Sequence, residues 1–110
     1  PRWTEHPQAL PAMLVAVDQA LSRPRQVVIA GAATAPETAA LVATARTAPG
    51  RARTILALTG HADDAWLAER APWMAGMRND SGRATAYVCD DFACRAPVTD
   101  PAALAALLAD

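Results

Sequence analysis

The stretch QVVIAG, from Gln26 to Gly31, decides the fold of this 110-residue chain. It is short, apolar and rich in β-branched residues, without alternation of apolar and polar positions. Such a run is typical of a strand that is buried on both faces, which occurs mainly in sheets covered by helices on each side. Gly31 marks the end of the strand. We therefore expect an α/β fold built around this segment.

Strand and helix patterns alternate along the rest of the chain. Further strands are expected over residues 53–58 and 83–88, and helices over residues 34–47, 63–70 and 101–108. Thr34, Asp63 or Asp64, and Asp100 are the expected N-caps of these helices. Before the first strand, a helix is expected to begin at Pro7 to Leu10, because apolar residues recur there at helical spacing: Leu10, Met13, Leu14, Val17 and Leu21.

This order predicts a single α/β domain over residues 1–110, with a leading helix in residues 1–23 and a βαβαβα unit in residues 24–110. We expect a small three-layer sandwich, in which a three-stranded, mainly parallel sheet carries helices on both faces. The leading helix should pack on one of these faces. A hairpin around Asp90-Asp91 would make the sheet mixed.

Composition argues against several classes of function. The formal net charge is −1, so the chain offers no basic surface for a nucleic-acid backbone. It has no apolar run near the ~18 residues that a membrane span needs, and no secretory leader pattern. We therefore expect a cytoplasmic protein that binds neither nucleic acid nor membrane. Because the sequence starts at Pro1 rather than at Met, we expect it to be a piece of a longer protein.

The loops that follow the strands form a candidate ligand edge, because the carboxyl ends of parallel strands meet at one edge of a sheet. Most of its residues also have a structural explanation as strand ends or helix caps. The first of these loops lacks the glycines of a dinucleotide-binding turn, and Pro36 removes a helix N–H that could hold phosphate. A small-ligand or nucleotide-binding module is therefore an alternative function. The candidate edge consists of Gly31, Thr34, Gly60, His61, Asp63 and Asp90.

Cys89 and Cys94 form the most distinctive motif, and their spacing leaves three interpretations open. Packed free thiols are favoured, because neighbouring Asp90 and Asp91 should raise the pKa of Cys89 and oppose a reactive thiolate. A reversible disulfide across the turn is the second interpretation, and it makes the two cysteines a candidate redox pair. A metal site is the third, but it would need two more ligands, and only His6 and His61 are available. We expect no metal, no cofactor and no catalytic set.

The few aromatic residues suggest a candidate interface. Trp3, Trp73 and Met74 are expected to lie on a surface that contacts another part of a larger protein, although such residues also fill gaps in a core. The segment from Tyr87 to Thr99 has a structural interpretation of its own. We expect it to close the domain, with Val88 in the core and Phe92 anchoring the turn.

The closing segment ATAYVCDDFACRAPVTDP, from Ala84 to Pro101, resembles that of the thioredoxin-domain-containing, spermatogenesis-associated-protein-like family. QVVIAG and the strand RTILAL after a Pro-Gly turn are also similar, and Asp91 stands where the family often has Asn. Members of the family look like three-part proteins. They have a thioredoxin-like domain, then an α/α-toroid similar to those of sugar epimerases, and then a small α/β tail. The family's closing motif matches Tyr87, Val88, Cys89, Phe92, Cys94, Pro97 and Thr99 of this chain.

The resemblance implies that this chain is the C-terminal tail of such a protein. It transfers no catalytic residue, because the chain carries neither the thioredoxin-like cysteine motif nor the inward-facing acids and histidines of the toroid. The implied function is a non-catalytic accessory domain in a protein linked to carbohydrate metabolism. The implied partners are the toroid and thioredoxin-like domains of the parent chain, with homodimerisation through an uncovered face as a consequence of their removal.

Overall fold

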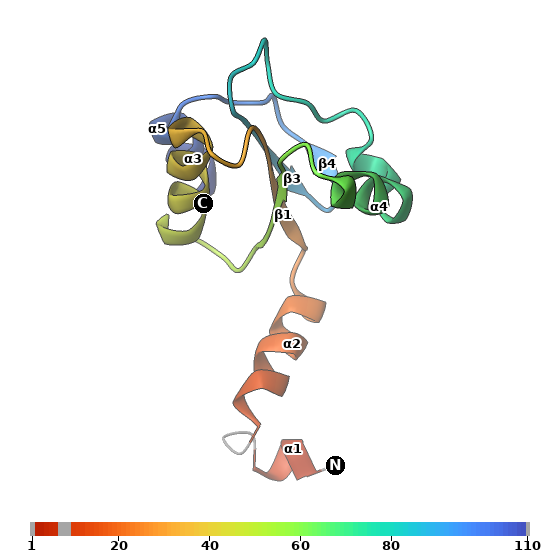
Figure 1. The fold of residues 1–110 in the computed structure, drawn as a ribbon. Helices are drawn as coiled ribbons and strands as arrows, with labels where there is room; N and C mark the ends of the chain where they lie inside the picture. Colours follow the sequence, from red (N-terminus) through yellow and green to blue (C-terminus); the bar gives the residue numbers. More distant parts are fainter. Residues whose placement is uncertain (1, 7–9, 110) are drawn as a thin grey trace.

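A computed structural model describes residues 2–6 and 10–109 of the chain. The helices and strands alternate, and Figure 1 shows their arrangement. In chain order they are α1 (Arg2–Glu5), α2 (Pro11–Leu21), β1 (Arg25–Ala30), α3 (Pro36–Thr47), β2 (Thr54–Leu58), α4 (Ala62–Arg70), the 3-10 turn η2 (Pro72–Met74), β3 (Thr85–Asp90), β4 (Ala93–Cys94) and α5 (Pro101–Leu108).

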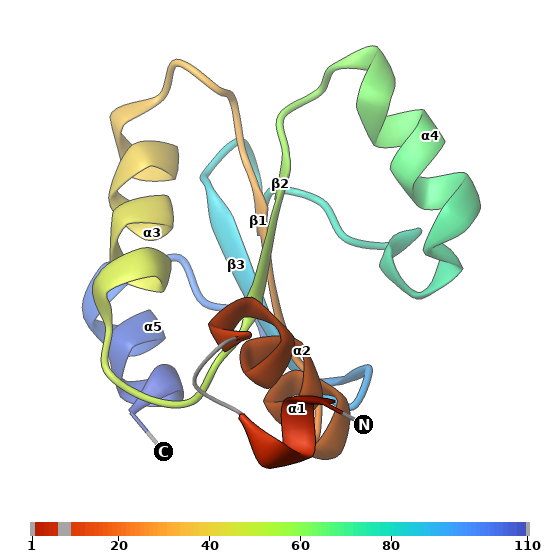
Figure 2. The same cartoon turned by 90° about the horizontal axis from the view of Figure 1, so that it is seen from below.

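The core of the fold is a four-stranded mixed sheet with the strand order β2-β1-β3-β4. β1 pairs in parallel with β2 and antiparallel with β3, and β3 pairs antiparallel with β4. The α/β class is therefore confirmed, with α3 and α5 on one face of the sheet and α4 with η2 on the other (Figure 2). The prediction of a three-stranded, mainly parallel sheet is wrong, whereas the expected hairpin after β3 is present.

β3 runs antiparallel to β1 because the connection from β2 runs along the length of the sheet and back again on the same face. α4 leads away from the edge at which β1 and β2 end, and residues 71–84 then return to that edge (Figure 2). Thr85 consequently lies opposite Ala30, and Asp90 lies opposite Arg25. The sequence pattern gave residues 71–82 no strand or helix, so it could not show that this segment reverses the direction of the next strand.

β1 is the central strand and is buried along its whole length, as its composition predicts. Val27 and Ile29 belong to the core cluster under α3 and α5, while Val28 belongs to the cluster under α4 and η2. Each of these three side chains is fully buried. β-branched residues on alternate faces thus fill two separate cores, which explains why the strand lacks apolar–polar alternation.

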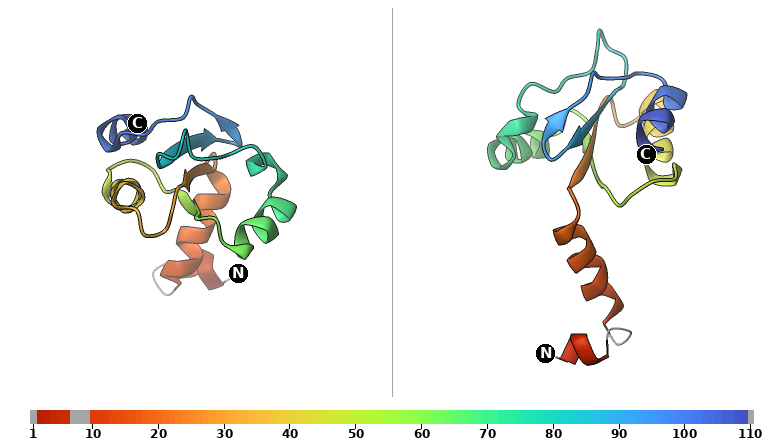
Figure 3. Two further views of the ribbon diagram at one scale, coloured as in Figure 1. Left: turned by 45° about the horizontal axis from the view of Figure 1, so that its top comes forward. Right: turned by 180° about the vertical axis from the view of Figure 1, so that it is seen from behind.

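α2 does not pack on the sheet, so that prediction is wrong. The helix extends away from the domain (Figure 1, Figure 3), and none of its residues is buried. It begins at Pro11, and the expected start at Pro7 falls among residues 7–9, outside the described part of the chain. Within residues 2–6 and 10–109, no helix combines the length and apolar character needed to cross a membrane.

The expected helix caps are only partly confirmed. Asp100 caps α5, because its carboxylate accepts a hydrogen bond of 2.9 Å from the N–H of Ala103. Thr34 does not cap α3, whose N-cap is Ala35 with Pro36 following it. Neither Asp63 nor Asp64 is the N-cap of α4, since that position is occupied by His61 without a side-chain hydrogen bond.

Candidate functional site

A cavity of about 610 Å³ lies outside the carboxyl ends of β1 and β2. Gly31, Gly60 and His61 of the predicted ligand edge line it. Asp90 lies at the opposite end of the sheet, beside the start of β1, because β3 runs antiparallel. The structure therefore brings together only part of the predicted edge. Thr34 and Asp63 are exposed and are not among the lining residues.

Asp64 organises the loop at the end of β2. Its carboxylate accepts hydrogen bonds from the N–H groups of Gly60, at 2.6 Å, and Thr59, at 3.4 Å. Gly60 has a φ of 84°, which favours glycine, so the turn that offers these N–H groups depends on this residue. A carboxylate of the chain itself thus satisfies the donors that could otherwise hold a phosphate.

Gly31 is required by packing. A Cβ at this position would lie 2.4 Å from Oγ1 of Thr38 and 2.9 Å from Cβ of Ala84. The end of β1 therefore approaches α3 and the start of β3 more closely than any other residue would permit. This close approach explains the glycine without a ligand.

One wall of the cavity comes from η2 and the residues after it, including Met74 and Met77. The Tyr87 hydroxyl fixes this segment, because it donates to the Arg78 carbonyl oxygen at 2.7 Å and accepts from the Arg78 N–H at 3.2 Å. Met74 is 2% exposed, so its predicted place in an interface is wrong. It fills the core between the sheet and α4 instead.

The other predicted interface residues differ in their surroundings. Trp73 is partly buried, and its ring meets that of Phe92 edge to face, with 5.5 Å between the ring centroids. The side chain of Trp3 lies outside the described part of the chain. Phe92 itself is 53% exposed, so the pair forms a partly open aromatic contact at the hairpin.

Cys89 and Cys94 form a disulfide, so the expectation of free thiols is wrong. The two residues lie directly opposite each other on β3 and β4, with a Cα–Cα distance of 3.9 Å. Asp91 and Phe92 form the two-residue turn between these strands, and both have a positive φ, as a type I′ hairpin requires. Cys89 is fully buried, whereas Cys94 is exposed.

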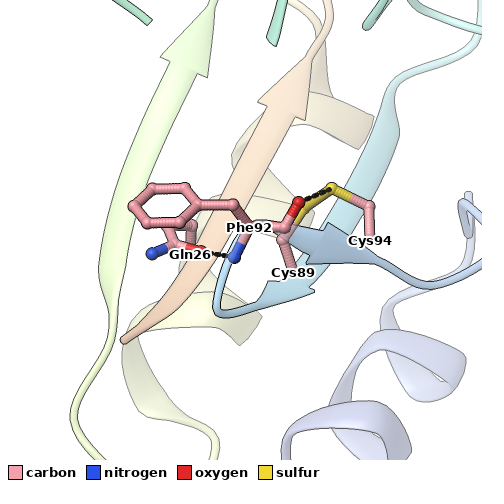
Figure 4. The surroundings of a disulfide bond; sticks show 4 residues. All are labelled: Gln26, Cys89, Phe92 and Cys94. Atoms are coloured by element: carbon pink, nitrogen blue, oxygen red, sulfur yellow. Dashed lines mark hydrogen bonds between the residues drawn. A yellow bond between two sulfur atoms is a disulfide. The ribbon is translucent and has the colours of Figure 1, made fainter. Parts of the chain in front are cut away.

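The turn is held against β1. Figure 4 shows the disulfide beside Phe92, whose N–H donates to Oε1 of Gln26 at 3.4 Å. Sγ of Cys94 lies 3.9 Å from the Phe92 carbonyl oxygen, a contact that can become a hydrogen bond only when Cys94 is a thiol. Val88 is fully buried in the core. These contacts support the predicted structural closure at Tyr87–Thr99.

Asp90 is surrounded by three arginines at the end of the hairpin. Its carboxylate accepts from Arg25 at 2.7 and 3.2 Å, from Arg95 at 3.1 Å, and from Arg51. The hydrogen bond from Arg25 and the three positive charges lower the pKa of Asp90, and partial burial opposes this shift. The sequence suggested a negative environment beside Cys89, but the local excess of charge is positive. Sequence reasoning missed this cluster, because its members come from four separate segments.

Comparison with known proteins agrees with the family resemblance. The chain is 35% identical to spermatogenesis-associated protein 20 of Homo sapiens over 109 residues, and 32% and 31% identical to the proteins of that name from Rattus norvegicus and Mus musculus. Each match covers 97% of this chain. The chain belongs to the spermatogenesis-associated protein 20 family. No family model matches it, and no solved structure gives a significant match.

The matched segment is a small part of these relatives. It spans 14% of the human protein and 13% of the two rodent proteins. The similarity therefore extends over nearly the whole of this domain but leaves most of each relative outside it. The disulfide and its hairpin lie inside the matched segment, since the match covers almost every residue of the chain.

Proposed function

We propose that this chain is a non-catalytic accessory domain that docks on the remainder of a longer, thioredoxin-domain-containing parent protein, with α2 as the docking element. The observation that carries the proposal is the apolar surface of α2, a helix with no buried residue. Several of its exposed side chains are large and apolar. Met13 is 50% exposed, Leu14 37%, Val15 58% and Leu21 83%, and Leu10, the residue just before the helix, is 44% exposed.

An apolar patch of this kind marks a contact surface, because leaving large aliphatic side chains in water is unfavourable. Leu10, Met13, Leu14 and Leu21 recur at the spacing of one helix face. The occupant that we propose is the rest of the parent chain, since the relatives are about seven times as long as the segment matched here. Cytoplasmic location and a link to carbohydrate metabolism are parts of the same proposal and rest on the family resemblance.

The hairpin chemistry is consistent with an accessory role. Cys89 and Cys94 are bonded to each other, so in this state neither thiol is available as a nucleophile. His61 of the predicted ligand edge is exposed in the loop before α4. We therefore assign the chemistry of the parent protein to its other domains.

The docking proposal is tested by mixing this chain with the rest of the parent protein, produced as a second polypeptide. We expect sedimentation to show a one-to-one complex. Leu14→Asp, which places a charge on the apolar face, should weaken that complex by at least tenfold, because burying an unpaired carboxylate costs several kcal/mol. Ala12→Asp is the matched control, since it adds the same charge on the opposite side of α2.

Three results would contradict the proposal. The first is the absence of a complex between the two polypeptides. The second is a complex that Leu14→Asp and Ala12→Asp weaken equally, which would mean that the apolar face is not the contact. The third is a stable homodimer of this chain that persists when the rest of the parent is present in excess, because α2 would then be occupied by a second copy.

The disulfide favours a second candidate function, a thiol redox element. A thiolate of a partner dithiol would attack the exposed Sγ of Cys94, and Cys89 would leave as a thiolate and take up a proton. The partner's second thiolate would then release Cys94, so that the partner is oxidised as the disulfide is reduced. The thiolate of Cys89 would form inside an apolar cluster that includes Val28 and Met77. Because an apolar environment disfavours a thiolate, this step would be slow.

Equilibration with mixtures of reduced and oxidised glutathione tests the redox candidate. Thiol counts that change within the range of cytoplasmic potentials would support it, since a disulfide in a reducing compartment is typically labile or regulatory. A disulfide that stays closed across that range would identify it as a structural cross-link only.

A further inference from the structure

β1 and β2 form a topological switch point. These two strands are adjacent and parallel, but the chain leaves them in opposite directions. β1 leads into α3 on one face of the sheet, and β2 leads into α4 on the other (Figure 2). The diverging connections leave a crevice outside the carboxyl ends of the strands, which is where open α/β sheets bind ligands.

The 610 Å³ cavity lies in this crevice. Its volume is that of a small-molecule site. The loop after β1 forms one side of it, with Gly31 and Ala32, and the loop after β2 forms another, with Gly60 and His61. The position of the cavity therefore follows from the topology of the sheet, independently of the docking surface on α2.

The walls of the cavity are mostly apolar. α4 turns small side chains toward it, and η2 with the following residues contributes Met74 and Met77, both of which are buried. The small side chains of α4 leave a space that suits a flat group. The apolar lining residues include Leu58, Ala65, Ala68, Met74 and Met77.

The polar groups at the cavity do not form an anion site. Asp64 and Arg78 both line it, so their formal charges cancel. The strand-end N–H groups of Thr59 and Gly60 already bind the Asp64 carboxylate. Pro36 occupies the first turn of α3 and offers no N–H. His61 and Asn79 add hydrogen-bonding groups without fixed charge.

We propose that this crevice binds a small, uncharged molecule with a flat aromatic or heterocyclic ring and hydrogen-bonding groups at its edge. The ring lies against the small side chains of α4, and its polar edge faces His61, Arg78 and Asn79. A phosphate-bearing nucleotide does not fit this site, because the donors that would hold its phosphate are used by Asp64.

Benzamide is a suitable probe, because it is uncharged and flat and carries an amide. In a titration of the 110-residue chain followed by amide NMR shifts, we expect saturable changes at residues 30–32, 59–61 and 77–79. Ala65→Leu should raise the Kd for benzamide by about tenfold or more, because the larger side chain fills the space for the ring. The variant should still fold, because Ala65 is exposed and lies outside both cores. Glu69→Leu is the matched control, because Glu69 lies on the same helix and its side chain is 79% exposed.

A parallel titration with adenosine monophosphate separates an uncharged ligand from a nucleotide. The proposal requires that benzamide moves the crevice amides and that the nucleotide does so more weakly. It is overturned if benzamide gives no saturable shift, if its shifts lie elsewhere or survive Ala65→Leu, or if the nucleotide binds the crevice more tightly. The docking experiment on α2 is unaffected by any of these outcomes, so the two proposals can fail separately.

Discussion

Replacing Asp90 by Asn should destabilise the domain more than any other conservative change at its surface. The side chain of Arg25 is 1% exposed, and two of its N–H groups are bonded to the Asp90 carboxylate. Removing one partner of a buried ion pair costs about 3–5 kcal/mol. The lower end of this range applies here, because Asp90 is 23% exposed, while the charge of Arg25 stays buried and loses this counterion. Arg51 and Arg95 are 36% and 40% exposed, so their pairs with Asp90 add little.

Urea unfolding of the wild type, Asp90→Asn and Asp91→Asn measures this difference. We expect Asp90→Asn to lower the free energy of unfolding by about 3 kcal/mol or more at neutral pH, a large share of the total stability of a small domain. Asp91→Asn is the matched control in the same turn. Its φ is 52°, a conformation that Asn adopts readily, so its stability should change by less than about 0.5 kcal/mol.

The pH dependence of this difference tests the cause. The pKa of Asp90 is lowered in the folded state from its ordinary value of 3.8. Its contribution is therefore fully present above pH 3.8 and is lost as pH falls through the lower pKa of the folded state. The gap in stability between wild type and Asp90→Asn should be constant from pH 5 upward and should narrow under acid. A loss below about 1 kcal/mol at neutral pH would refute the reasoning, and so would a gap that does not narrow in acid.

Two further changes test other parts of the argument. Replacing both Cys89 and Cys94 by Ala should lower the free energy of unfolding by about 2 kcal/mol, because the disulfide closes only a short loop; thermal unfolding measures this, and reduction of the wild type should give a similar loss. Gly31→Ala should cost about 1–3 kcal/mol in chemical unfolding, because its Cβ would overlap Thr38. Gly76→Ala should be nearly neutral by comparison, since nothing lies within 4 Å of a Cβ there.

The sequence predicted those parts of the fold that depend only on residues close together in the chain. β1 followed from its run of β-branched residues, and the start of α5 followed from Asp100 and Pro101. The direction of β3 could not be predicted, because it depends on the path of residues 71–84, which form no long regular element. The amphipathic pattern of α2 predicted a helix correctly, but a pattern cannot say whether the apolar face of a helix packs on its own domain.

The candidate site was predicted only where it depends on parallel strands. Gly31, Gly60 and His61 were placed correctly beside one another, since β1 and β2 are parallel neighbours. Asp90 was misplaced because the orientation of its strand was wrong. The turn at Asp91-Phe92 lacks the Asn-Gly or Asp-Gly signature of a type I′ hairpin, so the sequence did not show that the cysteines face each other.

The strand order has a consequence for how the isolated chain behaves at high concentration. β2 is the outermost strand on its side of the sheet, and its sequence TILAL carries no charge and no proline. The unpaired backbone groups of such an edge strand can pair with a strand from another molecule. Natural sheets commonly protect their edge strands with charges, bulges or a covering segment. Concentrated samples of the 110-residue chain should therefore self-associate through backbone pairing along β2. A lysine in place of Ala57, which is exposed on this strand, should suppress that association while leaving both cores intact.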